Sequence, residues 1–161
     1  MEVTRLFDIP YYQLENFPKS DSLSAKIGGK WVPTSTQEFV DQAMMVSKSL
    51  VAIGIEPGDK VAMISNNRPE WNITDIGILM CGAINVPIYP TISPKDYEFI
   101  FNDSQVKLCF VSDVELLAKV NEIKDNVSTL GPIISFEKID GIEHIEDFKK
   151  RGEQVPTSDI E

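Results

Sequence analysis

One stretch of the chain, residues 60–91, restricts the fold more than any other. It begins with the apolar run 61–64, which is followed by the polar residues 65–68. Pro69 then favours the start of a helix, because its missing N–H needs no partner at the first helical position. Apolar, extended character returns at residues 84–88. The pattern predicts a strand–helix–strand crossover, the repeating unit of a parallel sheet covered by helices.

Elements on both sides of this stretch alternate in the same way. Ser35 and Glu38 form a capping-box pattern ahead of an amphipathic helix. Two more helices are expected to begin near Ser93 and Asp113, and buried strands are expected at residues 106–111 and 133–136. We therefore expect an α/β fold, which is a layered, mostly parallel sheet with helices on both faces.

Two local features add detail to this expectation. Gly28 and Gly29 separate two short runs, residues 23–27 and 30–33, and predict a short N-terminal hairpin because glycine tolerates positive φ at both turn positions. Pro87 lies inside the expected strand at 84–88 and cannot donate a backbone hydrogen bond. That strand should therefore lie at an edge of the sheet or end its ladder early.

The length of 161 residues suits one domain. We divide the chain into an N-terminal arm at residues 1–22, an α/β subdomain at residues 23–151, and a linker or truncated end at residues 152–161. The arm is expected to contain a helical turn at residues 11–15. A last helix is expected from residue 143 to residue 151.

Composition argues against several classes of function. The formal net charge is −10, which disfavours a broad basic surface for nucleic acid. Cys81 and Cys109 lie in apolar runs and are interpreted as buried thiols, which fits a reducing compartment and predicts a cytoplasmic protein. His144 is the only histidine, so a histidine-based metal cluster or catalytic triad is poorly supported.

Candidate ligand-binding residues follow the first strand of the crossover. The segment Ser65-Asn66-Asn67-Arg68 would sit at the carboxyl end of a strand and at a helix N-terminus, where open α/β sheets bind ligands. Arg68 could hold a phosphate or carboxylate through two hydrogen bonds. The alternative is structural: Asn67 or Arg68 caps the helix, and Arg68 pairs with a nearby acid.

Trp71, Tyr89 and Thr91 complete the set of candidate site residues. The two aromatic rings could line a cleft, although a place in the core is the simpler explanation. Thr91 and Ser93 are interpreted as turn and cap residues, since no base that could activate them is near in sequence. The sequence contains neither a glycine-rich phosphate loop nor paired Cys or His at metal-ligand spacing. From the residues alone, we expect no catalytic set and no metal site.

Several segments of the chain occur together in a familiar order. They are Thr36-Gln37-Glu38-Phe39, the run from Leu50 and Gly54 through Pro57-Gly58-Asp59 to Ala62, the run from Ser65 to Trp71, and the run from Gly82-Ala83 to Thr91. With these segments, the chain resembles the AMP-forming acyl-CoA synthetases. The run from Asn67 to Trp71 and the run from Pro87 to Thr91 are most similar to the long-chain fatty acid–CoA ligases. The likeness covers residues 23–112 well and the rest loosely.

The resemblance implies an enzyme that activates a fatty acid with ATP and Mg²⁺ to an acyl-adenylate and then passes the acyl group to coenzyme A. Members of that family are far longer than 161 residues. Their nucleotide loop, adenine-contacting motifs and small C-terminal domain have no counterpart in this sequence. The family's catalytic residues therefore cannot be placed here. We expect an inactive N-terminal piece of a cytoplasmic ligase that could lie peripherally at a membrane.

Three further expectations concern partners and alternative functions. A piece of such an enzyme would expose apolar surface that the remainder of its own chain covers, so we expect self-association through sheet edges or swapped elements. The alternative function is a non-catalytic, stand-alone binding module on the same scaffold. A small flavodoxin-like domain with its own nucleotide site is a third hypothesis, which the missing phosphate loop disfavours.

Overall fold

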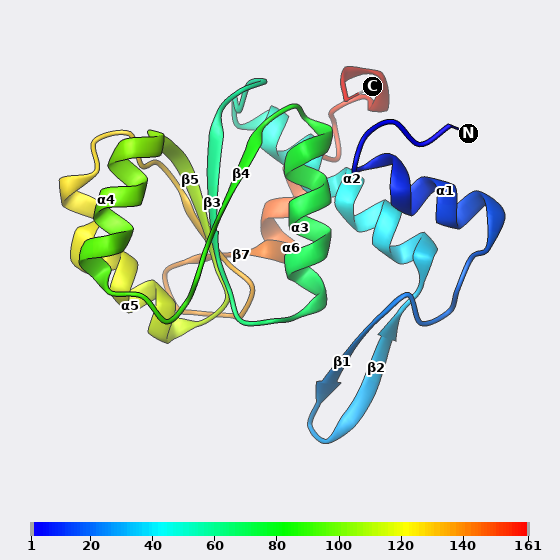
Figure 1. Ribbon diagram of the computed structural model, residues 1–161, viewed down its shortest axis with the longest axis horizontal. Coiled ribbons are helices and arrows are strands. Elements are labelled where there is room, and N and C mark those ends of the chain that lie inside the picture. Colours follow the sequence, from blue (N-terminus) through cyan, green and yellow to red (C-terminus); the bar gives the residue numbers. More distant parts are fainter. Residues whose placement is uncertain (1, 161) are drawn as a thin grey trace.

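A computed structural model describes residues 2–160 and places a five-stranded sheet between two layers of helices (Figure 1). The strand order is β4-β3-β5-β6-β7, and all neighbouring strands in this sheet are parallel. The strands are β3 (Lys60–Ile64), β4 (Ile84–Ile88), β5 (Val106–Val111), β6 (Ile133–Ser135) and β7 (Glu143–His144). A separate antiparallel hairpin joins β1 (Leu23–Ile27) to β2 (Lys30–Thr34). The expected α/β class and the hairpin are both confirmed.

The helices divide between the two faces of the sheet. They are α1 (Asp8–Asn16), α2 (Thr36–Ala52), α3 (Pro69–Met80), α4 (Pro94–Ser104), α5 (Val114–Ile123) and α6 (Ile145–Lys150), with short 3-10 turns η1 (Lys124–Asn126) and η2 (Thr157–Asp159). Side chains of α2, α3 and α6 pack against one face, and side chains of α4 and α5 pack against the other (Figure 1). Two apolar clusters result, with the sheet between them.

The central strand β3 shows why the sequence reads as continuously apolar there. Val61 and Met63 belong to the cluster under α2 and α3, whereas Ala62 and Ile64 belong to the cluster under α4 and α5. All four side chains are fully buried. A strand covered on both faces needs apolar residues at every position, because successive side chains point to opposite faces.

The caps of the helices follow the sequence signals. Ser35 and Glu38 form a reciprocal capping box at α2, and Gly54 follows that helix with a φ of 87°. Ser93 caps α4, and Asp113 accepts hydrogen bonds from the first amides of α5. Each of the N-terminal caps satisfies amide groups that a helix N-terminus leaves unpaired.

Strand β4 lies at an edge of the sheet, as Pro87 predicts, and its only strand partner within residues 2–160 is β3. The Ile84 N–H donates to the Asp59 carbonyl at 2.8 Å, so alternate residues from Ile84 onward face β3. Pro87 therefore faces outward, where its missing N–H costs no ladder bond. The ladder does not end early, because Pro87 and Ile88 still pair with β3 in register.

Two boundaries differ from the sequence-based expectation. The arm contains a helix of nine residues, α1, where only a turn at residues 11–15 was expected. The last helix begins at Ile145 instead of residue 143, because Glu143 and His144 add a short parallel strand beside β6. A pairing between segments distant in sequence, and not local propensity, decides this boundary.

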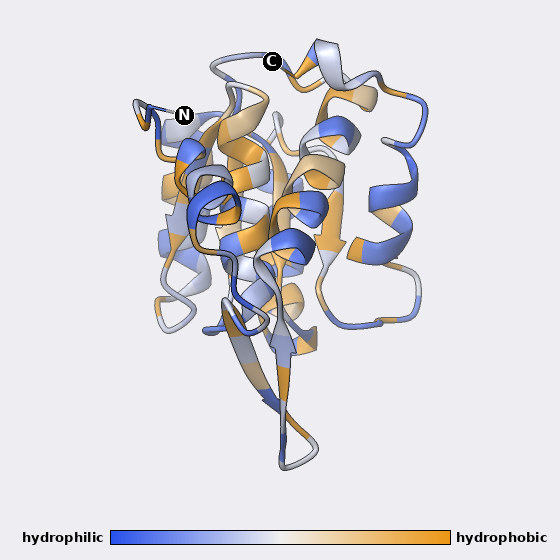
Figure 2. Ribbon diagram, turned by 90° about the vertical axis from the view of Figure 1, so that its right-hand side faces the viewer, coloured by the Kyte–Doolittle hydropathy of each residue, from blue (hydrophilic) through white to orange (hydrophobic). Residues whose placement is uncertain are grey.

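The hairpin extends away from the packed layers, and both of its strands contain apolar residues (Figure 2). Ile27, Trp31 and Val32 are 62%, 70% and 45% exposed, and no residue of either hairpin strand is buried. Its base is anchored, since Leu23 packs partly against the core. None of the helices within residues 2–160 is long and apolar enough to span a bilayer.

Candidate functional site

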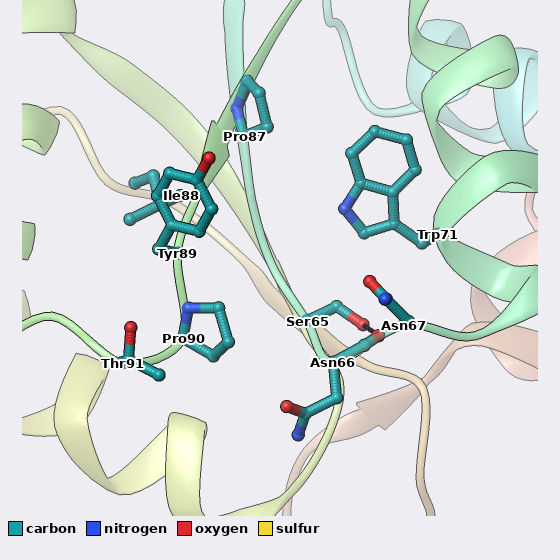
Figure 3. A pocket seen from close by; sticks show the side chains of 9 residues that line it. All are labelled: Ser65, Asn66, Asn67, Trp71, Pro87, Ile88, Tyr89, Pro90 and Thr91. Atoms are coloured by element: carbon teal, nitrogen blue, oxygen red, sulfur yellow. Dashed lines mark hydrogen bonds between the residues drawn. The ribbon is translucent and has the colours of Figure 1, made fainter.

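A cavity of about 610 Å³ opens where β3 and β4 end. Its lining comes from two segments far apart in sequence: Ser65, Asn66, Asn67 and Trp71 on one side, and Pro87, Ile88, Tyr89, Pro90 and Thr91 on the other. Figure 3 shows the Trp71 indole and the Tyr89 phenol on opposite sides of this space. Parallel strands end at a common edge, so the two loops that follow them meet there.

The geometry of each loop follows from its local sequence. β3 ends at Ile64, and α3 begins at Pro69, so the four residues between them form the crossing. Pro90 follows β4 directly, and the capping box at Ser93 begins α4. The Ser65 hydroxyl donates to the Asn66 carbonyl at 2.6 Å, which fixes the first residues of the crossing.

The cavity contains rings, amides and hydroxyls but no charged side chain in its lining. Trp71 is half-buried, and Tyr89 is 79% exposed. The interpretation of Tyr89 as a core residue is therefore wrong, because most of its side chain is exposed to solvent. Such a lining suits an uncharged part of a ligand, which aromatic faces and amide groups can contact.

Arg68 lies beside this cavity and not in its lining. Its Nε and Nη2 donate to the two oxygens of Glu70 at 2.9 and 3.0 Å, and its Nη1 is 3.5 Å from Glu137 Oε1. The guanidinium also stands 5.7 Å from the ring centroid of Phe136. The hydrogen bond to Glu70 raises the pKa of Arg68, and Glu137 adds to this effect. The expected pairing of Arg68 with a local acid is confirmed.

Arg68 does not cap α3 through its side chain, which the structural interpretation of the sequence had allowed. Arg68 occupies the N-cap position of α3, but its side chain makes no capping hydrogen bond. Its guanidinium already donates two hydrogen bonds to the Glu70 carboxylate. An incoming anion would therefore have to compete with Glu70 and Glu137 for Arg68. Binding of a phosphate or carboxylate by Arg68 stays a prediction.

A polar network that the sequence did not reveal joins the ends of β3 and β5. The Asn66 amide N–H donates to Ser112 Oγ at 3.3 Å, and the Asn66 side-chain nitrogen donates to Asp113 Oδ2 at 3.2 Å. Ser112 Oγ donates to Asp113 Oδ2 at 2.6 Å. Burial opposes ionisation of Asp113, but the hydrogen bonds from Ser112 and the α5 amides prevail and lower its pKa.

The titratable groups elsewhere have structural roles. His144 Nε2 lies 3.1 Å from the Phe136 carbonyl, and its Nδ1 accepts from the Glu146 N–H at 3.3 Å. Cys81 and Cys109 are buried free thiols, as expected, and burial raises the pKa of both. Within residues 2–160, no three His, Cys, Asp or Glu side chains come together in a group that could hold a metal ion.

Four of the five candidate residues, Asn67, Trp71, Tyr89 and Thr91, thus line one cavity, and the fifth, Arg68, borders it. Sequence reasoning placed Ser65 and Asn66 in the candidate segment but missed Pro87, Ile88 and Pro90 as lining residues. The signal that could have found them is the shared sheet edge, since the last residues of one strand and the loop after it lie beside the loop that follows the adjacent strand.

Comparison with known proteins gives a consistent result. The family model described as AMP-binding enzyme matches residues 12–159. The chain is 31% identical over 108 residues to the long-chain-fatty-acid–CoA ligase FadD15 of Mycobacterium bovis, covering 67% of this chain and 18% of that protein. It is 25% identical over 153 residues to the human long-chain-fatty-acid–CoA ligase ACSBG2, covering 92% of this chain and 23% of that protein.

Solved structures agree on the fold. The crystal structure of the anthranilate CoA ligase AuaEII in complex with anthranoyl-AMP superposes with a TM-score of 0.76 at 23% identity, over 89% of this chain and 26% of that one. The chain spans about a fifth of the length of the curated relatives named above. Because the family model covers almost all of the described residues, the chain belongs to the family of AMP-binding enzymes.

Proposed function

We propose that this chain forms part of a long-chain fatty acid–CoA ligase. That enzyme would use ATP to convert a fatty acid to an acyl-adenylate and would then transfer the acyl group to coenzyme A. The observation that carries the proposal is the family match over residues 12–159, joined by 31% identity to a long-chain-fatty-acid–CoA ligase. ATP, fatty acid and coenzyme A are accordingly the substrates that we propose for the whole enzyme.

The contribution of this chain is the cavity between the β3 and β4 loops. We assign to it the binding of an uncharged portion of one substrate, since its lining offers Trp71, Tyr89 and the Asn67 amide but no charged group. Within residues 2–160, no three His, Cys, Asp or Glu side chains gather, so we assign no Mg²⁺ ligand to this chain. No step of the reaction is assigned to a metal bound by this chain.

The test is an activity assay on the full-length protein that contains this chain. We expect release of pyrophosphate from ATP that depends on palmitate, followed by formation of palmitoyl-CoA when coenzyme A is added. Acetate and benzoate serve as competing acids of other classes. No palmitate-dependent pyrophosphate release would refute the proposed reaction, and release with benzoate alone would refute the substrate class.

The cavity has its own test in the same assay. Trp71→Ala removes an aromatic wall, so we expect the KM of one substrate to rise at least tenfold with kcat largely retained, as for a binding contact made equally in ground and transition states. Trp31→Ala is the matched control, because that indole lies on the hairpin, outside this cavity. Equal effects of the two variants would remove the cavity from the substrate path.

A second candidate function is a binding module without catalysis. The observation that favours it is the cavity of about 610 Å³, whose lining carries aromatic rings and amides but no charged side chain. Fluorescence titration of the 161-residue chain with ATP, coenzyme A or palmitate distinguishes the two functions. We expect the chain alone to form no thioester. Submicromolar binding of one ligand, together with a full-length protein inactive toward all acids, would establish the binding module instead.

We also propose that the isolated chain self-associates in solution. Ile27 and Val32 are exposed on one face of the hairpin and Trp31 is exposed on the other, and exposed apolar side chains of this kind tend to find partners. The edge of β4 is less suited, because Pro87 removes an outward donor. Sedimentation equilibrium showing only monomer at high concentration would contradict this. The buried free thiols support a cytoplasmic location, where thiols stay reduced.

A further inference from the structure

The loop at residues 89–92 carries three lining residues of the cavity, Tyr89, Pro90 and Thr91, and side chains of α4 and α5 hydrogen-bond its main chain. Tyr97 on α4 points its hydroxyl at the carbonyls of Tyr89 and Pro90, at 3.3 and 3.1 Å. The Tyr97 side chain is fully buried in the cluster under α4 and α5. Burial raises its pKa to about 12, so the phenol stays protonated and remains a hydrogen-bond donor at neutral pH.

Lys119 on α5 holds the same loop. Its Nζ donates to the Pro90 carbonyl at 2.7 Å and to the Ile92 carbonyl at 3.2 Å. It also stands 5.8 Å from the ring centroid of Tyr97, within cation–π range. Within residues 2–160, Lys119 forms no ion pair with a carboxylate, so the loop carbonyls are the polar partners of its ammonium group.

The remaining end of the loop is held by the cap of α4. The Ser93 N–H donates to Asp96 Oδ2 at 3.1 Å, and Ser93 Oγ accepts from the Asp96 N–H at 3.3 Å. The carbonyls of Tyr89, Pro90 and Ile92 and the N–H of Ser93 therefore all have side-chain partners. Ordering the backbone of a free loop costs roughly 1–2 kcal/mol per residue, and a loop that is already ordered avoids this cost when a ligand binds.

We propose that Lys119 and Tyr97 are positioning residues, which hold the main chain of residues 89–92 so that Tyr89 and Thr91 form one wall of the cavity. Neither residue lines the cavity itself. Both would act on a bound substrate only through the loop, by fixing the carbonyls of Tyr89, Pro90 and Ile92. The effect on substrate binding rests on the proposed function of the cavity, whereas the effect on loop order does not.

The first experiment measures loop order in the 161-residue chain, without any ligand. NMR relaxation gives order parameters for the amides of Thr91, Ile92 and Ser93. We expect values near about 0.85 in the wild-type chain and below about 0.6 in Lys119→Met. Tyr97→Phe, which keeps the ring and removes the hydroxyl, should act in the same direction. Lys119→Arg should restore order, because a guanidinium can donate to the same carbonyls.

Lys124→Met is the matched control, since it removes the same charge from an exposed side chain just after α5. Its order parameters at residues 91–93 should equal those of the wild-type chain. Unchanged order in both Lys119→Met and Tyr97→Phe would overturn the proposal.

The second experiment measures steady-state kinetics of the full-length protein with palmitate, ATP and coenzyme A. If the loop has the conformation that binds substrate in only about a tenth of the molecules, the KM of the substrate that uses the cavity rises about tenfold. We expect this rise in Lys119→Met, its reversal in Lys119→Arg, and none in Lys124→Met. A wild-type protein without activity would refute the proposed function but not the loop result. A disordered loop with all three KM values unchanged would overturn the functional part of this inference.

Discussion

The sheet and the hairpin both contain large apolar side chains, and the sheet buries most of its own whereas the hairpin leaves its own exposed. Phe110 in β5 is fully buried, with ring centroids 6.0 Å from Phe136 and 5.7 Å from Phe148. Trp31 in β2 is 70% exposed. The difference lies in what covers each strand: β5 has a helical layer on both faces, whereas the tip of the hairpin extends beyond the layers. Burial is thus decided by neighbouring elements and not by the hydropathy of the residue.

The hairpin owes its shape to its turn, and the sheet owes its shape to packing. Gly28 and Gly29 adopt φ values of 56° and 81°, which a two-residue hairpin turn requires. A hairpin of two strands is only marginally stable in water, so contacts at its base are needed. Substitutions in the two regions should therefore have very different effects on the free energy of unfolding.

The largest effect is expected for Phe110→Ala. Removing a buried aromatic ring leaves a cavity among Phe136 and Phe148, and such changes typically cost about 3–5 kcal/mol of unfolding free energy. Urea denaturation followed by circular dichroism measures this loss. Phe99→Ala is the control, because that ring is 70% exposed and its loss should change stability by less than about 0.5 kcal/mol. Similar losses in the two variants would break the distinction between covered and uncovered positions.

Gly77→Ala should give the next largest effect, because α2 and α3 touch at this glycine. An added Cβ would lie 2.7 Å from Val46 Cβ and 2.8 Å from the Ala43 carbonyl oxygen. Helix propensity favours alanine by about 1 kcal/mol, but overpacking against main chain costs about 1–3 kcal/mol, so we expect net destabilisation. Asn72→Ala, at an exposed position of the same helix, should not destabilise. A stabilised Gly77→Ala variant would mean that the two helices can separate freely.

Lys107→Met tests a charged contact at the margin of the core. Lys107 lies 2.7 Å from Asp59 Oδ1, and this hydrogen bond lowers the pKa of Asp59 below its usual value of 3.8. A lowered folded-state pKa contributes stability above pH 3.8 that is lost as pH falls through the folded value. The variant should therefore be less stable than wild type by at most about 1 kcal/mol at neutral pH.

The same difference should vanish in acid, because Asp59 is then protonated with or without its partner. Urea titrations at neutral pH and at a pH well below 3.8 measure it. Lys124→Met provides the control for loss of one positive charge. A stability gap that persists unchanged in acid would show that Lys107 acts through packing of its stem and not through its charge.

Trp31→Ser should have the smallest effect on folding and a clear effect on association. The exposed indole contributes little to unfolding free energy, so a change within about 0.5 kcal/mol is expected. Sedimentation equilibrium should show weaker self-association, since the variant removes the largest apolar side chain of the hairpin. A loss above about 2 kcal/mol would mean that the hairpin tip is part of the folded core and does not differ from the sheet in burial.

Much of the fold could be predicted from the sequence, because local signals agreed with the packing. The period of the apolar residues, the caps at Ser35 and Asp113, and the outward Pro87 each act within a few residues. The candidate site was predicted in part, since strand ends mark ligand sites in open sheets. The exposure of Tyr89 was not predicted, because whether a ring is covered depends on elements distant in the sequence.

The sequence by itself determined which segments become strands and helices, and where most of them begin, because these choices depend on local hydrogen bonds and on the spacing of apolar side chains. Only the tertiary structure decided the strand order, the pairing of Glu143 and His144 with β6, and the meeting of Trp71 with Tyr89 across one cavity. It also decided that Lys119 donates hydrogen bonds to the carbonyls of the loop after β4. These contacts join residues far apart in the chain, so their geometry exists only once the layers have packed.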